Sequence, residues 1–232
     1  MENFQGLFEK QELDASGIKY GTDKCSKEHD FLRKYQFFLE PWKNDAFTFL
    51  ELGIFNGQSL KMWRDFFPNA RVVGVDINPS AVNYVPDMEC KIGDLGNIDF
   101  LTSLQSYKPR LVIDDASHIW SHQLNAFFTL FPHLQPGGIY IIEDICTSFE
   151  PWATIHKSYD SVTPFRVMET LAECLTSQEK TQTGIRVLPL SPPGPYQSLI
   201  EAIAKTVDCV AFIKFSCLII KKKQPSSAIA GA

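Results

Sequence analysis

The stretch that decides the fold is FTFLELGIFNG, residues 47–57. It starts as an apolar run of strand-forming residues, passes the acid Glu51, and then carries glycines at Gly53 and Gly57. Glycine lets a backbone turn sharply and approach a ligand closely. An apolar strand that runs through such a turn into a helix is typical of the first unit of a doubly wound α/β sheet.

Short apolar strands alternate with helices on both sides of this stretch. Further strands are expected at 71–76, 90–92, 110–114 and 139–143, with helices at about 58–67, 79–85, 98–106, 121–131 and 166–176. Residues 207–215 and 216–220 are expected to form a closing antiparallel hairpin. The alternation predicts a Rossmann-like, mostly parallel sheet with helices on both faces.

Composition fits one globular domain, since 44% of the 232 residues are hydrophobic and 21% are charged. The organisation predicted along the chain starts with a helical segment at 1–45 that covers the cofactor site. A catalytic domain follows at 46–222, with a substrate lid at 146–165 and a surface loop at 177–196. The last residues, 223–232, are expected to form a flexible tail.

Charge and terminal sequence exclude several partners. The formal net charge of −5 disfavours nucleic acid, which calls for a basic face. The amino terminus lacks the basic and apolar regions of a signal peptide, and the longest stretch without Lys, Arg, Asp or Glu, 116–142, contains histidines and amides. A cytoplasmic enzyme without membrane contact is therefore expected, with its six cysteines as free thiols. Homo-oligomerisation is left open.

Acids stand at the ends of four of the five predicted parallel strands. They are Glu51, Asp76, Asp114 with Asp115, and Glu143 with Asp144. In an open parallel sheet, ligands bind at the carboxyl ends of the strands, which all lie on one edge. The sequence therefore predicts one crevice lined by carboxylates.

The cofactor predicted for this crevice is an adenosine ligand without a pyrophosphate. The turn after the first strand reads E-x-G-x-x-x-G, which is not the G-x-G-x-x-G that cradles a dinucleotide. Asp76 ends the second strand, where an acid takes the ribose hydroxyls, and Asp94 follows the third strand, near the expected adenine edge. S-adenosylmethionine fits this pattern better than NAD, so a nicotinamide oxidoreductase is disfavoured.

A divalent metal site is predicted at two neighbouring strand ends. Asp115, Glu143 and Asp144 offer hard oxygen ligands that suit Mg²⁺, with Mn²⁺ or Ca²⁺ as alternatives. Without a cation, three carboxylates at this spacing would repel one another. His118, three residues after Asp115, is expected to be functional because it lies beside this site. His122 is expected to be structural, with a substrate contact as the alternative.

Several motifs follow one another in an order that carries a family resemblance. They include Gly21-Thr-Asp-Lys24, His29-Asp30, Glu51-Leu-Gly53, Asp114-Asp-Ala-Ser-His118 and Tyr140-Ile-Ile-Glu-Asp144. Over roughly residues 18–148 the chain resembles the macrocin and mycinamicin sugar O-methyltransferases. These are class I enzymes that depend on S-adenosylmethionine and Mg²⁺ and methylate natural products. The resemblance implies a seven-stranded sheet whose last strand is reversed.

The resemblance also implies roles for individual residues. It assigns the metal to Asp115, Glu143 and Asp144, and the general base to His118. The expected cofactor contacts are Thr22, Lys24, Glu51, Gly53, Asn56, Gly57, Ser59, Asp76, Ile77, Asp94 and Asp114. Apart from the resemblance, the lid aromatics Phe149, Trp152 and Tyr159 are candidate substrate contacts. Ala116 stands where the family usually has glycine, a small departure.

The predicted function is transfer of a methyl group from S-adenosylmethionine to a hydroxyl of a small natural product, with a sugar as the first choice. A polyketide or catechol hydroxyl is the alternative acceptor, because a catechol also offers two adjacent oxygens to a metal. A module that binds S-adenosylmethionine without catalysis is a further alternative. The sequence does not identify the acceptor or the position methylated.

Overall fold

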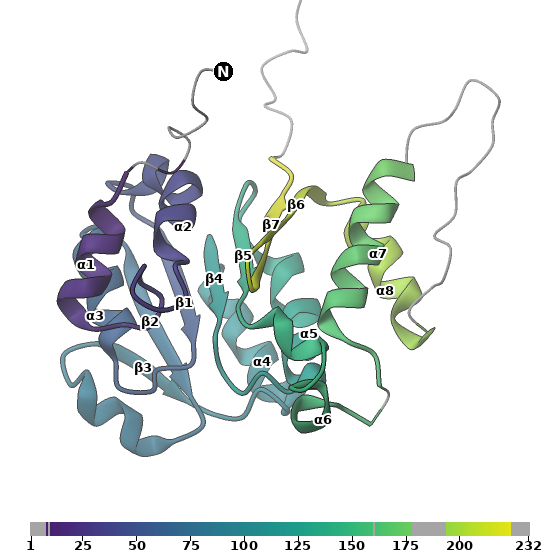
Figure 1. The fold of residues 1–232 in the computed structure, drawn as a ribbon, viewed down its shortest axis with the longest axis horizontal. Helices are drawn as coiled ribbons and strands as arrows, with labels where there is room; N and C mark the ends of the chain where they lie inside the picture. Colours follow the sequence, from purple (N-terminus) through teal and green to yellow (C-terminus); the bar gives the residue numbers. More distant parts are fainter. Residues whose placement is uncertain (1–7, 9, 160, 178–193, 224–232) are drawn as a thin grey trace, which may run out of the picture.

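The computed structural model describes residue 8 and residues 10–159, 161–177 and 194–223. It contains a seven-stranded sheet in the order β3-β2-β1-β4-β5-β7-β6 (Figure 1). The strands are β1 (Thr48–Leu52), β2 (Arg71–Asp76), β3 (Glu89–Ile92), β4 (Leu111–Asp114), β5 (Ile139–Ile142), β6 (Val207–Ile213) and β7 (Ser216–Lys221). Neighbours among β1 to β5 pair in parallel, whereas β7 is antiparallel to both β5 and β6. The predicted fold class is confirmed.

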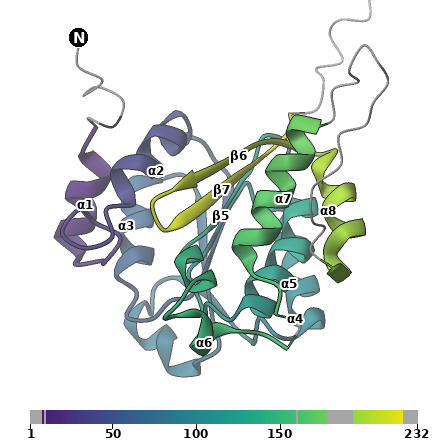
Figure 2. The ribbon, with the colours of Figure 1, turned by 45° about the vertical axis from the view of Figure 1, so that its right-hand side comes forward.

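Helices cover both faces of the sheet (Figures 1 and 2). On one face lie α1 (Glu12–Tyr20), α2 (Leu32–Leu39) and α3 (Gln58–Phe66). On the other lie α4 (Ile98–Leu104), α5 (Trp120–Leu130), α7 (Pro164–Ser177) and α8 (Gln197–Ala204). The short helix α6 (Ala153–His156) lies near the bottom of the view in Figure 2. The 3-10 helices are η2 (Glu40–Trp42), η3 (Pro79–Tyr84), η4 (Gln105–Tyr107), η5 (Phe131–His133), η6 (Ile145–Ser148) and η7 (Gly194–Tyr196).

Two hydrophobic cores lie on opposite faces of the sheet, because successive strand residues point to opposite sides. In β1, Leu50 and Leu52 pack into the core that α4, α5, α7 and α8 cover. Phe49 packs into the other core, beside Trp63 of α3. Complete burial of a leucine stabilises a fold by roughly 1.5–3 kcal/mol. The two cores therefore hold the sheet in place from both faces.

Local structure differs from the predictions mainly after β5. The segment of the predicted lid, residues 146–165, for which the sequence predicts no helix, contains most of η6 and all of α6. A single turn such as α6 is too short to show helical periodicity. Helix α8 was not predicted, although Ile200, Ile203 and Ala204 form its buried face. Most of the predicted surface loop and of the tail lie outside the described residues. None of the helices in the described ranges combines the length and apolar character that a membrane crossing requires.

Candidate active site

A cavity of about 540 Å³ opens at the carboxyl edge of the sheet, among the loops that follow β1, β2, β3 and β4. Five of the expected cofactor contacts line it: Gly53, Asn56, Asp76, Ile77 and Asp94. Asp115 and His122 also lie on its wall. The volume lies within the range of small-molecule and cofactor sites. The topology therefore brings together residues that the sequence keeps up to about 70 positions apart.

Asp76 organises the loops around this cavity. Its Oδ2 accepts hydrogen bonds from the backbone N–H groups of Ile54 at 2.8 Å and Phe55 at 3.2 Å. Its Oδ1 accepts one from the N–H of Asn78 at 2.8 Å. These bonds tie the turn after β1 to the turn after β2. The carboxylate is thereby held at the cavity wall in one orientation.

Other residues of the wall were not expected from the sequence. They include Phe55, Asn78, Ala81, Tyr84, Leu95, Ser117 and Ile119. Phe55 adopts a left-handed backbone with φ 47° and is 78% exposed. A loop side chain of this kind follows no periodicity, so no sequence pattern marks it.

Six expected cofactor contacts do not line this cavity: Thr22, Lys24, Glu51, Gly57, Ser59 and Asp114. The Glu51 carboxylate is wholly buried and accepts a hydrogen bond from Trp63 Nε1 at 3.1 Å. Asp114 is also wholly buried, beside the Tyr140 hydroxyl at 3.4 Å. Burial raises the pKa of both carboxyls to about 7. These two acids therefore lie inside the fold, below the edge of the sheet.

A side chain at Gly53 would clash with the backbone of the loop that follows β4. The φ of Gly53 is +102°, and a Cβ built on it would lie 2.1 Å from the backbone oxygen of Asp115. The close approach lets β1 and β4 bring their loops together at the cavity. Glycine is therefore required here by both conformation and space.

We expect Gly53→Ala to destabilise the protein by about 1–3 kcal/mol, because it adds a backbone clash to a strained φ. It should also weaken cofactor binding, since the loop of Asp115 must move. Urea unfolding and calorimetry with S-adenosylmethionine measure the two effects. Gly21→Ala is the matched control, because Gly21 has φ +74° but no atom within 4 Å of its Cβ position. If Gly53→Ala and Gly21→Ala lost the same stability and the same cofactor affinity, the close approach of Gly53 to the Asp115 backbone would not be important.

Beside the cavity, Asp115, His118 and Asp144 form a cluster whose ligand atoms all lie within 4.8 Å of one another. His118 Nε2 is 3.5 Å from Asp144 Oδ2 and 3.9 Å from Asp115 Oδ1. His118 and Asp144 both have a left-handed backbone, with φ 56° and 51°. Non-glycine residues rarely adopt this conformation, and such strain often accompanies functional sites.

Glu143, the third predicted metal ligand, pairs with a lysine. Its Oε2 lies 2.6 Å from Nζ of Lys24, which also contacts Asp115 Oδ2. Glu143 Oε1 is buried and makes no hydrogen bond with any of the described residues. A divalent cation next to Asp115 and Asp144 would satisfy this oxygen. The donor set of the cluster therefore fits the predicted ion.

The charges of the cluster are held in a largely buried environment. Burial lowers the pKa of Lys24, but the carboxylates of Asp115 and Glu143 outweigh it and raise that pKa well above its ordinary value. Burial raises the pKa of Glu143 and of Asp144. Three acids with one lysine leave two negative charges if all are ionised. A single divalent cation would balance them.

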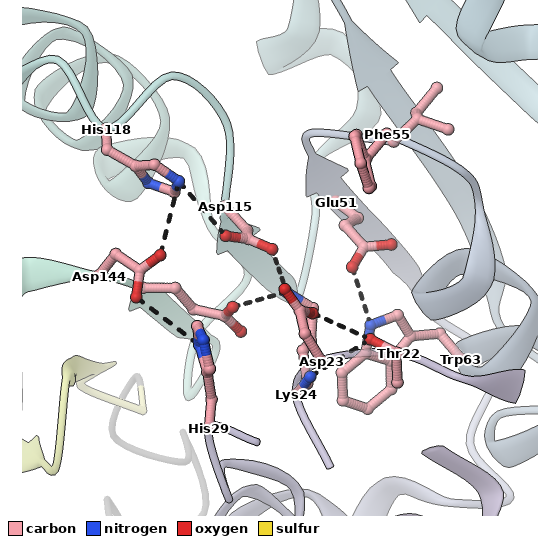
Figure 3. A network of polar contacts seen from close by, with 12 residues as sticks. Thr22, Asp23, Lys24, His29, Glu51, Phe55, Trp63, Asp115, His118 and Asp144 are labelled. Atoms are coloured by element: carbon pink, nitrogen blue, oxygen red, sulfur yellow. Dashed lines mark hydrogen bonds and ion pairs between the residues drawn. The ribbon is translucent and has the colours of Figure 1, made fainter. Parts of the chain in front are cut away.

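Two further histidines flank the cluster and were given no role from the sequence. His29 Nδ1 lies 3.9 Å from Asp144 Oδ1 (Figure 3). The ring of His156, from α6, packs edge-on against His118 with their centroids 6.0 Å apart. Burial lowers the pKa of His156, and His118 acts in the same direction. Helix α6 thereby places a residue of the predicted lid beside the cluster.

The expected substrate contacts occupy different places. Phe149 and Trp152 are about half exposed, and Tyr159 is fully exposed. Phe149 packs against Phe165 with ring centroids 4.8 Å apart. His122 lies on the cavity wall, where its Nδ1 is 3.0 Å from Ser117 Oγ.

The chain resembles several O-methyltransferases of Micromonospora and Streptomyces species. It is 34% identical over 153 residues to mycinamicin VI 2''-O-methyltransferase of Micromonospora griseorubida, covering 61% of this chain and 38% of that protein. It is 32% identical over 181 residues to demethylmacrocin O-methyltransferase of Streptomyces fradiae, covering 73% and 46%. It is 36% identical to L-olivosyl-oleandolide 3-O-methyltransferase of Streptomyces antibioticus, covering 60% and 38%. No family model matches the chain.

Solved structures show the same likeness. MycE methyltransferase of the mycinamycin biosynthetic pathway, solved with Mg and SAH, superposes with a TM-score of 0.73 at 26% identity. The match covers 91% of this chain and 53% of MycE. The resemblance predicted from the motifs is thereby confirmed. The chain nevertheless spans less than half the length of the curated relatives it matches.

Proposed function

We propose that this relative of the mycinamicin and macrocin O-methyltransferases transfers a methyl group from S-adenosylmethionine to a hydroxyl of a glycosylated natural product, with the help of Mg²⁺. The observation that supports this best is the place of Asp115, which belongs both to the cavity wall and to the acidic cluster. A cofactor in the cavity and an ion at the cluster would therefore be neighbours. Relatives named for methylation of such compounds, and a neighbour with Mg and SAH, support the same reading.

The cofactor side of the reaction uses the loops of the cavity. Asp76 would take the ribose hydroxyls with the carboxylate that its backbone bonds orient. Asp94 and His122 line the cavity next to each other, close to Gly96, and there they would border the adenine. Gly53 allows the methionine part to pass close to the backbone. Together these contacts would aim the sulfonium methyl toward Asp115.

The acceptor side uses the cluster. Asp115, Glu143 and Asp144 would hold the ion, and a bound divalent cation lowers the pKa of a hydroxyl that it coordinates. His118 Nε2, which faces Asp115 and Asp144, would take the proton of the acceptor hydroxyl as general base. The exposed rings of Phe149 and Trp152 would cover the apolar part of the acceptor and exclude water.

We expect chelation with EDTA to abolish methyl transfer and added Mg²⁺ to restore it. The assay follows S-adenosylhomocysteine release with a panel of glycosides and polyketide hydroxyls, and mass spectrometry identifies the product. Calorimetry with S-adenosylmethionine in EDTA is the control, because the cavity should bind the cofactor without the ion. Full turnover in EDTA would exclude the metal role. Cofactor binding without turnover on any acceptor would favour a non-catalytic module.

A further inference from the structure

Lys24 is a buried cation inside the acidic cluster. It comes from the loop between α1 and α2, and its side chain is 2% exposed. Its backbone oxygen accepts hydrogen bonds from the N–H groups of Phe31 at 2.9 Å and Leu32 at 3.3 Å. These bonds fix the loop from which the side chain reaches the ends of β4 and β5 (Figure 3). The ammonium therefore has a defined place.

The lysine occupies one oxygen of each of two carboxylates. Nζ contacts Asp115 Oδ2 and lies 2.6 Å from Glu143 Oε2. The second oxygens remain: Asp115 Oδ1 faces His118 at 3.9 Å, and Glu143 Oε1 makes no hydrogen bond within the described part of the chain. Burial, and after it the carboxylate of Glu143, raises the pKa of the Tyr35 phenol, but the Tyr35 hydroxyl makes no hydrogen bond of ordinary geometry with the described residues. Each carboxylate thus offers a single oxygen to an ion.

We propose, on the basis of the metal role proposed above, that Lys24 makes the site selective for Mg²⁺ over Ca²⁺ by confining Asp115 and Glu143 to one ligand oxygen each. Ca²⁺ takes six to eight oxygens and readily binds both oxygens of a carboxylate. Mg²⁺ is smaller, takes six ligands in octahedral geometry and commonly keeps waters. An ion that bound both oxygens of Glu143 would lie next to the ammonium, and like charges at that distance repel.

Lys24→Met tests the proposal, because it keeps an unbranched side chain and removes the charge. Calorimetry without cofactor measures the dissociation constants of Mg²⁺ and Ca²⁺ for both proteins. We expect the ratio of the two affinities to shift toward Ca²⁺ by about tenfold or more, since groups that orient metal ligands change the affinity for a metal by roughly 10–100-fold. A general loss of stability would not change this ratio. Lys24→Arg is the matched control, and it should retain much of the preference for Mg²⁺ because it keeps the charge.

A second measurement needs no variant and covers the case in which Lys24→Met fails to fold. Infrared difference spectra of the wild-type protein with Mg²⁺ should show the wide carboxylate splitting of one-oxygen binding. An unchanged affinity ratio in folded Lys24→Met, or a two-oxygen signature assigned to Asp115 or Glu143 with Mg²⁺, would overturn the selectivity role alone. A wild-type protein that binds S-adenosylmethionine but no Mg²⁺ would overturn the metal role as well.

Discussion

Replacing His118 with alanine should lower the turnover number by about 10²–10⁴-fold, the range expected for loss of a general base. The imidazole lies 3.5 Å from Asp144 and 3.9 Å from Asp115, so it stands beside the oxygens that would position the acceptor. It does not line the cavity in which the cofactor is expected. The loss should therefore appear in turnover, while the affinity for S-adenosylmethionine stays within about twofold of the wild type.

Two histidine variants serve as controls for this result. His133 is exposed, so His133→Ala should leave turnover and binding unchanged. His122 lies on the cavity wall, so His122→Ala should weaken the cofactor affinity more than the turnover number. Calorimetry with Mg²⁺ decides what His118 does. If His118→Ala abolishes Mg²⁺ binding, His118 is a metal ligand, and if it is fully active, the base lies elsewhere.

The position of the cavity could be predicted because sheet topology determines it. Parallel strands end at one edge, so acids that directly follow successive strands are brought to that edge. Asp76, Asp94 and Asp115 indeed line one cavity, although they come from the carboxyl ends of three different strands or the loops that follow them. The hairpin β6–β7 could also be predicted, since two apolar runs close the sheet after the last helix. The spacing of apolar residues and the positions at which strands end can be read directly from the sequence.

The depth of individual strand residues was harder to predict. Glu51 was expected at the edge, yet it precedes the last residue of β1 and points to the face that α3 covers. Side chains alternate between the two faces of a strand. An acid placed one residue earlier along the strand can therefore point into a core instead of toward the ligand-binding edge of the sheet. Asp114 is likewise the last residue of β4 and wholly buried.

Contacts made by long side chains could not be predicted. Lys24 meets Asp115 and Glu143 across 91 and 119 residues of sequence. The family resemblance implied a cofactor contact for it, whereas the structure places its ammonium among the carboxylates. A flexible side chain reaches whichever partner the packed fold leaves nearby, and no spacing rule encodes that choice. The contact of His156, from the single turn of α6, with His118 of the cluster could not be predicted for the same reason.

Replacing Glu51 with glutamine should change the dependence of stability on pH. Burial raises the pKa of Glu51 in the folded protein from 4.5 to about 7, although Lys24 acts in the opposite direction. Between these two pH values the unfolded chain loses the proton and the folded chain keeps it. The contribution of Glu51 to the free energy of unfolding therefore falls as pH rises from about 4.5 to 7 and then levels off. Integrated over the shift, the loss is about 3 kcal/mol.

Glutamine has the size and neutrality of the protonated acid and can still accept the hydrogen bond from Trp63. We expect Glu51→Gln and the wild type to be about equally stable at pH 4.5, and the variant to be more stable by up to about 3 kcal/mol at pH 8. Urea unfolding in EDTA over this range measures the difference without any contribution from a metal ion. The control is Glu28→Gln, because Glu28 is exposed and its replacement should leave the profile unchanged. A variant that is less stable at pH 8 would mean that Glu51 is ionised there and serves Lys24 as a third carboxylate partner, since the loss of a paired buried charge destabilises the remaining lysine.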